Sequence, residues 1–211
     1  MNTSLSIILL GPPIVGKGSL AVQLSTALNV PHIAVGKLLH ERERANRDSR
    51  INDAIAKGEL VSDEVVIAVV SERLAQGDCV PGFIIDGYPR TRAQAEQPAV
   101  VANANYIFLI TASEELLIER ARGRRVCSNG HSWNLNHLPP RDPNVCDICG
   151  EPLVARADDQ PEIVHYRLAR YRDEIAPIEE FYQTRIIELD GRLSPAELCQ
   201  QVVARINHTN D

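Results

Sequence analysis

The stretch GPPIVGKGS at residues 11–19 follows directly on the apolar run LSIILL at residues 5–10. A short continuous apolar run is typical of a strand that is buried on both faces of a parallel sheet. Glycines let backbone N–H groups of a loop turn inward, and a helix that begins there adds its positive end. A plain strand-to-helix turn is the alternative. Because strand, loop, lysine, hydroxyl and helix come in this order, we predict a loop that binds phosphate.

The spacing within this loop is that of a nucleotide-binding motif. Gly11 and Gly16 are separated by four residues, Lys17 follows the second glycine, and Gly18 and Ser19 come next. We expect the Lys17 ammonium to reach the terminal phosphates of a nucleotide and the Ser19 hydroxyl to bind Mg²⁺. The motif predicts nucleotide binding as a class and leaves the reaction open.

The apolar pattern of the remaining chain alternates between strand and helix. Short apolar runs predict strands at 5–10, 30–35, 83–86, 106–110 and 186–190. Helical spacing predicts helices at 16–28, 38–76, 161–185 and 194–206, with a break at Gly58, a restart capped by Ser62 and a bend near Pro177. Such alternation predicts an α/β fold of three layers, in which helices cover a parallel sheet of five strands.

The composition agrees with one domain that has room for a small insertion. The chain has 211 residues, 44% of them hydrophobic and 24% charged. Its net charge of −6 argues against duplex DNA as a partner, because non-specific binding to DNA needs a basic face. For this reason we expect no nucleic-acid partner. The N-terminal apolar run is too short for a membrane span, so we expect no membrane partner either. An odd number of cysteines, five, favours a reducing compartment, and we expect a cytoplasmic protein.

Residues 127–153 break the alternation and predict a small inserted lobe. Cys146 and Cys149 have the C-x-x-C-G spacing of a zinc knuckle, in which the turn directs both sulfurs at one ion. Cys127 and His131 are the candidates that complete a tetrahedral Zn²⁺ site, with His137 as a rival for the fourth position. Cysteines that only pack or stay free are the remaining interpretation. Four protein ligands leave no open position, so we expect Zn²⁺ to be structural and to stabilise a lobe with little apolar content.

Four longer stretches resemble a known family. They are GELVSDEVV at 58–66, GFIIDGYPRTRAQAEQ at 82–97, RARGRRV at 120–126 and RADDQPEIVHYRL at 156–168. With the inserted lobe, they make nearly the whole chain similar to nucleoside monophosphate kinases, and most of all to adenylate kinases of the long bacterial type. The resemblance implies reversible transfer of the terminal phosphoryl group from Mg·ATP to AMP, which gives two ADP. Phosphoryl transfer requires that two polyanions are aligned and that the negative charge developing on the phosphate oxygens is stabilised. The planar, permanently charged guanidinium group of arginine is suited to both tasks.

The resemblance also implies a division of the chain and roles for single residues. The core is 1–122 and 161–211, an AMP-binding segment at 34–63 lies within it, a zinc-bearing lid spans 123–160, and the protein is a monomer. Catalysis falls to Lys17, Arg90, Arg124, Arg156, Arg167 and Asp86, with Asp86 ordering the Mg²⁺ waters. ATP binding falls to Gly11, Ile14, Val15, Gly16, Lys17, Gly18, Ser19, Arg120, Arg124, Ser132, Trp133 and Leu193. AMP binding falls to Val35, His40, Glu59, Leu60, Val61, Gly87, Tyr88, Pro89, Arg90, Gln94, Arg156 and Arg167. Asp158 and Asp159 are expected to orient the lid arginines.

The chain departs from the family pattern on both sides of the predicted site. Ile14 and Val15 stand where the loop usually has glycine, and a positive φ at Ile14 would be strained. On the AMP side, Val35, Lys37 and His40 replace threonine, aspartate and arginine. A weakened nucleotide-binding relative is therefore one alternative. A kinase for another monophosphate, such as UMP or CMP, is a second, which the long zinc-bearing lobe argues against.

Overall fold

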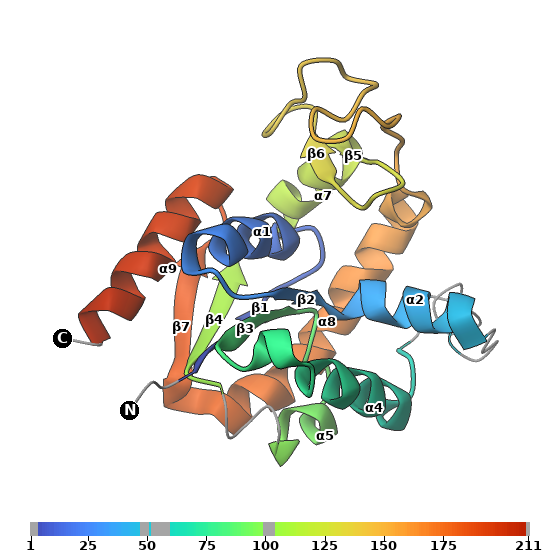
Figure 1. The fold of residues 1–211 in the computed structure, drawn as a ribbon. Coiled ribbons are helices and arrows are strands. Elements are labelled where there is room, and N and C mark those ends of the chain that lie inside the picture. The colour runs from blue at the N-terminus through green and yellow to red at the C-terminus, as the bar shows by residue number, and fades with distance from the viewer. Residues whose placement is uncertain (1–3, 47–50, 52–59, 99–103, 210–211) are drawn as a thin grey trace.

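The computed structural model describes residues 4–46, 51, 60–98 and 104–209. Its centre is a sheet of five parallel strands in the order β2-β3-β1-β4-β7 (Figure 1). The strands are β1 (Leu5–Leu10), β2 (His32–Ala34), β3 (Gly82–Asp86), β4 (Tyr106–Thr111) and β7 (Ile186–Asp190). The predicted five-stranded parallel sheet is thus confirmed.

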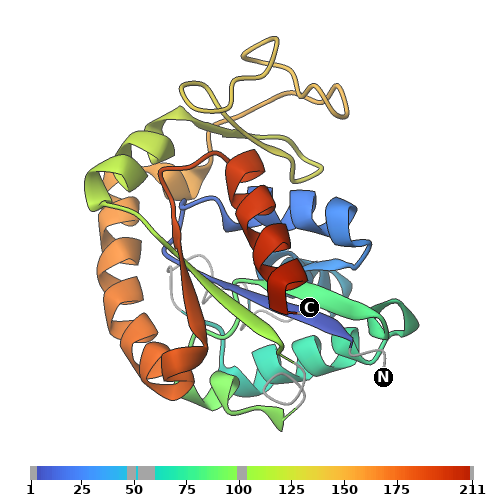
Figure 2. The ribbon, with the colours of Figure 1, turned by 90° about the vertical axis from the view of Figure 1, so that its left-hand side faces the viewer.

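Helices cover both faces of this sheet, as Figures 1 and 2 show. One layer holds α1 (Lys17–Leu28), α7 (Glu114–Gly123) and α9 (Pro195–Thr209), the other holds α2 (Val35–Asn46), α4 (Asp63–Leu74) and α5 (Arg92–Ala95), and the long α8 (Pro161–Tyr182) contributes to both. The side chains of β1 alternate between the layers. Ile7 and Leu9 pack in one core cluster and Ile8 and Leu10 in the other, and all four are buried. A strand buried on both faces explains why its sequence is apolar without interruption.

Several predicted boundaries were wrong. The strand predicted at 30–35 is shorter, because Val35 begins α2. Val35 is buried against the same core cluster as Ile33, so the apolar run continues from strand into helix and gives no sign of the boundary. The region predicted as 38–76 contains α2 and α4, and the break at Gly58 lies outside the described residues. Ser62 precedes α4 as predicted, but its side chain makes no capping hydrogen bond.

The helices at the C-terminal end also differ at their limits. Helix α8 ends at Tyr182, and a 3₁₀ turn, not α-helix, covers 183–185. Pro177 lies inside α8, whose axis turns in its C-terminal part (Figure 2). Helix α9 begins at Pro195 and continues beyond the predicted end at 206.

The inserted lobe lies between α7 and α8 and projects from the sheet domain at the top of Figure 1. Its strands β5 (Arg124–Val126) and β6 (Ser132–Asn134) form an antiparallel pair in which Arg125 lies opposite Trp133. A separate small cluster contains the buried residues Cys127, Cys146 and Leu153. The lobe is thus built apart from the two clusters of the sheet.

The phosphate loop leaves the carboxyl end of the central strand. Strand β1 has β3 on one side and β4 on the other, so the chain proceeds from the centre of the sheet in both directions. In open parallel sheets, ligands bind in the crevice at the carboxyl ends, where the strand order reverses. Within the ranges that the structure describes, no helix has both the length and the apolar character needed to cross a membrane.

Candidate active site

The loop between β1 and α1 has the backbone that its glycines predict, except at one position. Gly11 and Gly16 have φ values of +146° and +108°. A Cβ on Gly11 would lie 2.7 Å from the carbonyl oxygen of Ile110, so no side chain fits there. Ile14 also has a positive φ, +72°. A β-branched residue in this region costs about 1–3 kcal/mol. The loop therefore keeps a left-handed turn at Ile14 in spite of the strain.

The Lys17 side chain folds back over its own loop. Its Nζ donates hydrogen bonds to the carbonyl oxygens of Gly11, at 2.8 Å, and Pro12, at 2.9 Å. The carbonyls hold the ammonium over the concave side of the turn. Lys17 is the first residue of α1, so the positive end of the helix lies at the same place. This arrangement is suited to a polyphosphate.

Charged groups that lie far apart in the sequence act together on Lys17. The pKa of Lys17 is lowered to about 8, chiefly by burial and also by Arg90, Arg167 and Arg124, while the Asp86 carboxylate opposes the shift. These groups come from the end of β3, the segment after it, α8 and the start of β5. The fold thus brings five of the six predicted catalytic residues into one electrostatic neighbourhood, which favours a bound anion.

The segment after β3 turns sharply at the edge of the sheet. Gly87 has a φ of +79°, and the peptide bond between Tyr88 and Pro89 is cis. The Tyr88 hydroxyl donates to the carbonyl of Gln94, and Arg90 Nε donates to the carbonyl of Gly87 at 3.1 Å. This turn places Arg90 next to the end of β3.

Two residues that the sequence did not predict lie at the end of β3 and the segment after it, and one of them, Asp63, supports the segment. Asp63, at the start of α4, accepts hydrogen bonds from Thr91 Oγ1 at 2.9 Å and Gln94 Nε2 at 2.7 Å. Gln94 is 2% exposed, and its Oε1 accepts from the backbone N–H of Arg90 at 2.8 Å. His32 Nε2 lies 3.8 Å from Asp86 Oδ2 and has no hydrogen-bond partner. In the sequence, Asp63 is marked only by its position in the acidic first turn of a helix, and nothing in the sequence marks His32 as part of the site.

The lid arginines are held by carboxylates. Arg124 forms a two-bond pair with Asp159, whose Oδ2 accepts from Nε at 2.7 Å. Arg156 pairs in the same way with Asp158, at 2.8 Å for both bonds, and Arg167 Nη1 donates to Asp158 at 2.7 Å. The two aspartates therefore orient three arginines.

Arg120 connects the stem of the lid to the phosphate loop. Its Nη1 donates to the carbonyl of Val15 at 3.1 Å, and burial lowers its pKa. Asn134 in β6 donates from Nδ2 to the carbonyl of Arg120 at 2.8 Å. Arg120 thus links the loop to the first hairpin of the lid.

The predicted AMP-binding residues of α2 and its surroundings are dispersed. Val35 is 2% exposed and packs in the core, whereas His40 is exposed. Lys37 is exposed and pairs with Glu41, at 3.8 Å. Leu60 is half-buried and Val61 is buried, while Glu59 lies outside the described residues. The described residues among these do not supply the guanidinium group that the family pattern has at this position.

Three predicted ATP contacts lie outside the loop 11–19 in the sequence. Ser132 is exposed in β6, and Leu193 packs against the core cluster that also holds α1 and α9. Trp133 packs against the small cluster of the lid, and its Nε1 donates to Cys146 Sγ at 3.4 Å. The indole N–H of Trp133 is therefore directed at the cysteine cluster.

Four lid residues form a group that could hold a metal ion. The ligand atoms of Cys127, His131, Cys146 and Cys149 all lie within 4.8 Å of one another. His131 Nδ1 is 3.3–3.5 Å from the three sulfurs, and the sulfurs of Cys127 and Cys149 are 3.6 Å apart. Tetrahedral zinc, with bonds of about 2.3 Å to sulfur and about 2.0 Å to nitrogen, requires about 3.5 Å and about 3.8 Å for these two kinds of distance. The four residues therefore fit zinc.

The rival ligand is not part of this group. His137 Nε2 lies 3.4 Å from the Glu119 carboxylate, so His131 is the histidine of the cluster, as predicted. Burial raises the pKa of the Cys146 thiol, but hydrogen bonds from Trp133 and from the backbone N–H groups of Cys149 and Ile148 outweigh it and bring the pKa to about 6. A thiol with such a pKa is readily available as a thiolate ligand.

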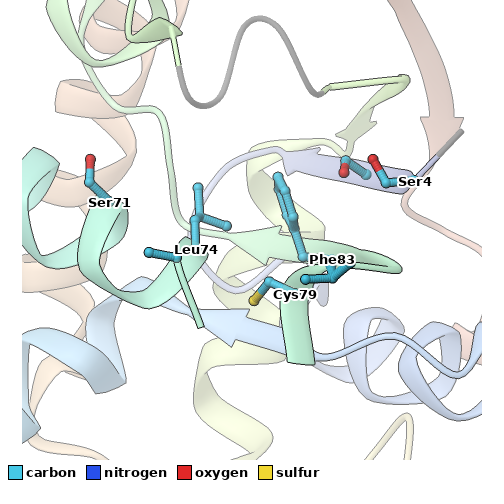
Figure 3. Close-up of a pocket in the computed structure, with 8 residues that line it drawn as sticks. Ser4, Ser71, Leu74, Cys79 and Phe83 are labelled. Atoms are coloured by element: carbon cyan, nitrogen blue, oxygen red, sulfur yellow. The ribbon is translucent and has the colours of Figure 1, made fainter. Parts of the chain in front are cut away.

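A hollow of about 350 Å³ lies at the opposite edge of the sheet from the phosphate loop. Figure 3 shows its wall, formed by Ser4 and Phe83 at the amino ends of β1 and β3, by Ser71 and Leu74 of α4, and by Cys79. It contains none of the predicted site residues.

The strand that leads into a phosphate loop with its lysine is typical of P-loop proteins. Together with the arginines around Lys17 and the inserted lobe, it indicates a P-loop phosphotransferase. The model of the family described as adenylate kinase matches residues 9–187. The chain is 35% identical over 209 residues to an adenylate kinase of Thermosipho melanesiensis, covering 94% of this chain and 98% of that protein. It is 39% identical over 206 residues to an adenylate kinase of Thermoanaerobacter pseudethanolicus, with coverages of 93% and 95%.

The chain belongs to the adenylate kinase family. It is a nucleotide-binding phosphotransferase whose reaction is the conversion of ATP and AMP to two ADP.

Proposed function

We propose that the reaction takes place at the carboxyl edge of the sheet, with the ATP phosphates in the loop 11–19 and the AMP phosphate beside Arg90. The observation that carries this proposal is the convergence of Asp86, Arg90, Arg124 and Arg167 on the Lys17 ammonium. In phosphoryl transfer the protein takes little part in covalent chemistry. Most of the catalysis therefore comes from positive charges that are held in position around the phosphates.

Two carboxylates orient the arginines that we propose to bind the transferring phosphoryl group. Asp159 pairs with Arg124, and Asp158 pairs with Arg156 and with Arg167 of α8. A transferring phosphoryl group offers three oxygens to the same guanidinium groups, whose planar forks match it. Arg156 and Arg167 share one aspartate and are thus placed to act on the same phosphoryl group.

Mg²⁺ with ATP would be held by the Ser19 hydroxyl, and Asp86 would order the waters bound to it. Asp86 ends β3 next to the amino end of α1, where its Oδ2 lies 3.4 Å from the position that a Cβ on Gly18 would take. Mg²⁺ prefers oxygen ligands. When bound, Mg²⁺ neutralises the charge that develops on the phosphate oxygens.

Closure of the lid and of the segment 34–63 over the sheet edge would exclude water, which otherwise accepts the phosphoryl group. Gly123 and residues 159–161 are the proposed hinges of the lid. At Gly123, a Cβ would lie 2.7 Å from Asn134 Oδ1, so a larger residue would displace the Asn134 amide that donates to the carbonyl of Arg120.

The AMP side keeps Arg90 and the buried Gln94 but has lost the usual threonine and arginine. Gln94 is fixed by hydrogen bonds to Asp63 and to the backbone N–H of Arg90. Its side-chain amide therefore stabilises the turn at Arg90, and we propose that Gln94 also contacts the adenine of AMP. Val35 is buried and apolar, and the exposed imidazole of His40 is shorter than the arginine that it replaces. We expect weaker AMP binding and not a loss of the reaction.

The lid metal is proposed to be a structural Zn²⁺ held by Cys127, His131, Cys146 and Cys149. The chemistry of three thiols and one imidazole, at distances that suit a tetrahedron, supports it. When bound, zinc supplies folding energy to the lid. A monomer in the cytoplasm, without a membrane or nucleic-acid partner, completes the proposal, and gel filtration tests the monomer.

An assay of ADP formation from ATP and AMP tests the catalytic roles. Lys17→Ala should lower kcat by about 10²–10³-fold while the circular dichroism spectrum stays unchanged, because a preorganised charge is lost. Lys37→Ala removes the exposed lysine of α2 and should change kcat less than threefold, since each exposed ion pair contributes about 0–1 kcal/mol. No ADP formation by the natural chain at millimolar AMP would contradict the proposal.

A further inference from the structure

Trp133 is the single tryptophan of the chain, and it lies in the lid. Its ring packs against the cluster of Cys127, Cys146 and Leu153, and its Nε1 donates to Cys146 Sγ at 3.4 Å. Buried tryptophans usually place the indole N–H on a hydrogen-bond acceptor. Here that acceptor is a sulfur of the proposed metal site.

A hydrogen bond to a ligand sulfur has two physical effects. It fixes the direction in which the sulfur presents its lone pairs, and it withdraws negative charge from the thiolate. The knuckle itself supplies backbone donors to Cys146, whereas Trp133 reaches it from another strand, β6. The bond therefore joins the second half of the proposed site to the first hairpin of the lid.

Strand β6 makes a further contact at its other end. Asn134 donates to the carbonyl of Arg120, and Arg120 donates to the carbonyl of Val15 in the phosphate loop. Neighbouring residues of one short strand thus touch the cysteine cluster and the stem that leads to the ATP side.

We propose that Trp133 is a positioning residue for the lid metal: its indole N–H holds the Cys146 sulfur as a ligand, and through β6 the bound metal keeps Arg120 against the phosphate loop. The proposal rests on the metal site proposed above. It gives Trp133 a role that the sequence resemblance, which assigned this residue to ATP binding, does not contain.

The test removes the N–H and keeps the ring. Because the chain has one tryptophan, growth of a tryptophan auxotroph on 3-benzothienylalanine replaces this residue alone by an isostere with sulfur in place of N–H. Trp133→Phe is the genetic counterpart. Zn²⁺ affinity is measured by competition with a chromophoric chelator, and Co²⁺ in the same site reports on the thiolates through its charge-transfer absorption.

We expect both proteins to bind Zn²⁺ about 10–100-fold more weakly, as for other lost partners of metal ligands. The Co²⁺ charge-transfer band should shift, because a thiolate without the hydrogen bond is a stronger electron donor. The KM for ATP should rise several-fold while the KM for AMP stays unchanged. Leu153→Ala is the matched control, since it loosens the same cluster but keeps the N–H, and it should leave the band in place.

Three results would overturn the inference. An isostere protein with unchanged zinc affinity and an unchanged Co²⁺ band shows that the hydrogen bond does not act on the metal. An effect in Trp133→Phe without one in the isostere assigns the effect to packing. A natural chain that binds no Co²⁺ overturns the metal site as well, which separates that failure from the first two.

Discussion

The phosphate loop begins at a strand with both faces buried, whereas the lid has a cluster of three buried residues, Cys127, Cys146 and Leu153. The sheet clusters contain most of the buried aliphatic side chains of the described ranges and draw on helices from both layers. The lid replaces this apolar area with a group of metal-ligating side chains. One region is thus fixed by burial, whereas the other has few buried apolar side chains and a cluster that we propose to bind a metal.

The same difference holds for the cations of the two regions. Lys17 is held by carbonyl groups of its own loop, so its position is set by the backbone. Arg124 and Arg156 are held by the carboxylates of Asp159 and Asp158, which a phosphate can replace. The position of Lys17 is thus set by its own backbone, whereas the positions of Arg124 and Arg156 are set by side-chain ion pairs.

Removal of the metal should have the largest effect and should affect the lid alone. Structural zinc contributes about 10–16 kcal/mol in small zinc domains, and the lid cluster is too small to replace that contribution. We expect amides of 123–160 to lose protection in hydrogen exchange after chelation, while amides of β1 and β4 keep theirs. Cys149→Ser should reproduce the loss, and Cys199→Ser, a free thiol of α9, should not. Equal loss of protection in both regions would contradict the comparison.

A cavity in the sheet should lower the stability of the sheet domain and leave metal binding by the lid unchanged. Phe108 is 0% exposed in β4, and Phe108→Ala should lower the free energy of unfolding by about 3–5 kcal/mol. We expect the zinc affinity of the lid at 25 °C to stay unchanged, because Phe108 has no part in the lid cluster. Urea unfolding gives the first quantity and chelator competition the second. Val22→Ala, at an exposed position of α1, is the control and should change stability by less than about 0.5 kcal/mol.

Loss of one lid carboxylate should have a smaller effect, on the reaction. Asp159→Asn removes the charge that orients Arg124, and a charge-assisted hydrogen bond contributes about 1.5–3 kcal/mol. We expect kcat to fall about 10–100-fold and the melting temperature to fall by about 3–12 °C. Glu96→Gln breaks the surface pair with Arg92 and should leave kcat unchanged. An unchanged kcat in Asp159→Asn would mean that the loop alone orients the phosphates.

The pH dependence of ATP binding should be the smallest effect. The pKa of Lys17 is lowered to about 8 without nucleotide, chiefly by burial, and bound phosphates favour the charged form. Below this pH the lysine is already protonated, whereas above it binding has to take up a proton. Affinity should therefore fall as the pH rises above about 8, by at most about tenfold per pH unit. Calorimetry on the natural chain and on Lys17→Ala, which should lack this decline, checks the assignment.

Local patterns predicted the sheet because each strand carries its own signal. The run LSIILL and the glycines after it gave the central strand and the loop without knowledge of any partner. The boundary at Val35 was wrong because a buried strand and the buried face of a helix meet there and are equally apolar. Asp63 was not recognised as a support for Gln94, since the two residues are 31 positions apart and only the packing of α4 joins them.

The sequence by itself determined the order of strands and helices, the position of the phosphate loop and the cysteines of the lid, because hydrophobic period, glycine spacing and the C-x-x-C turn are local properties. Only the tertiary structure decided that His131 and not His137 joins the cysteines, that Ile14 takes a left-handed conformation, and that Lys17 lies among groups of four other segments. These depend on which segments fold back on one another, and that is set by the burial of whole elements and not by any single stretch of residues.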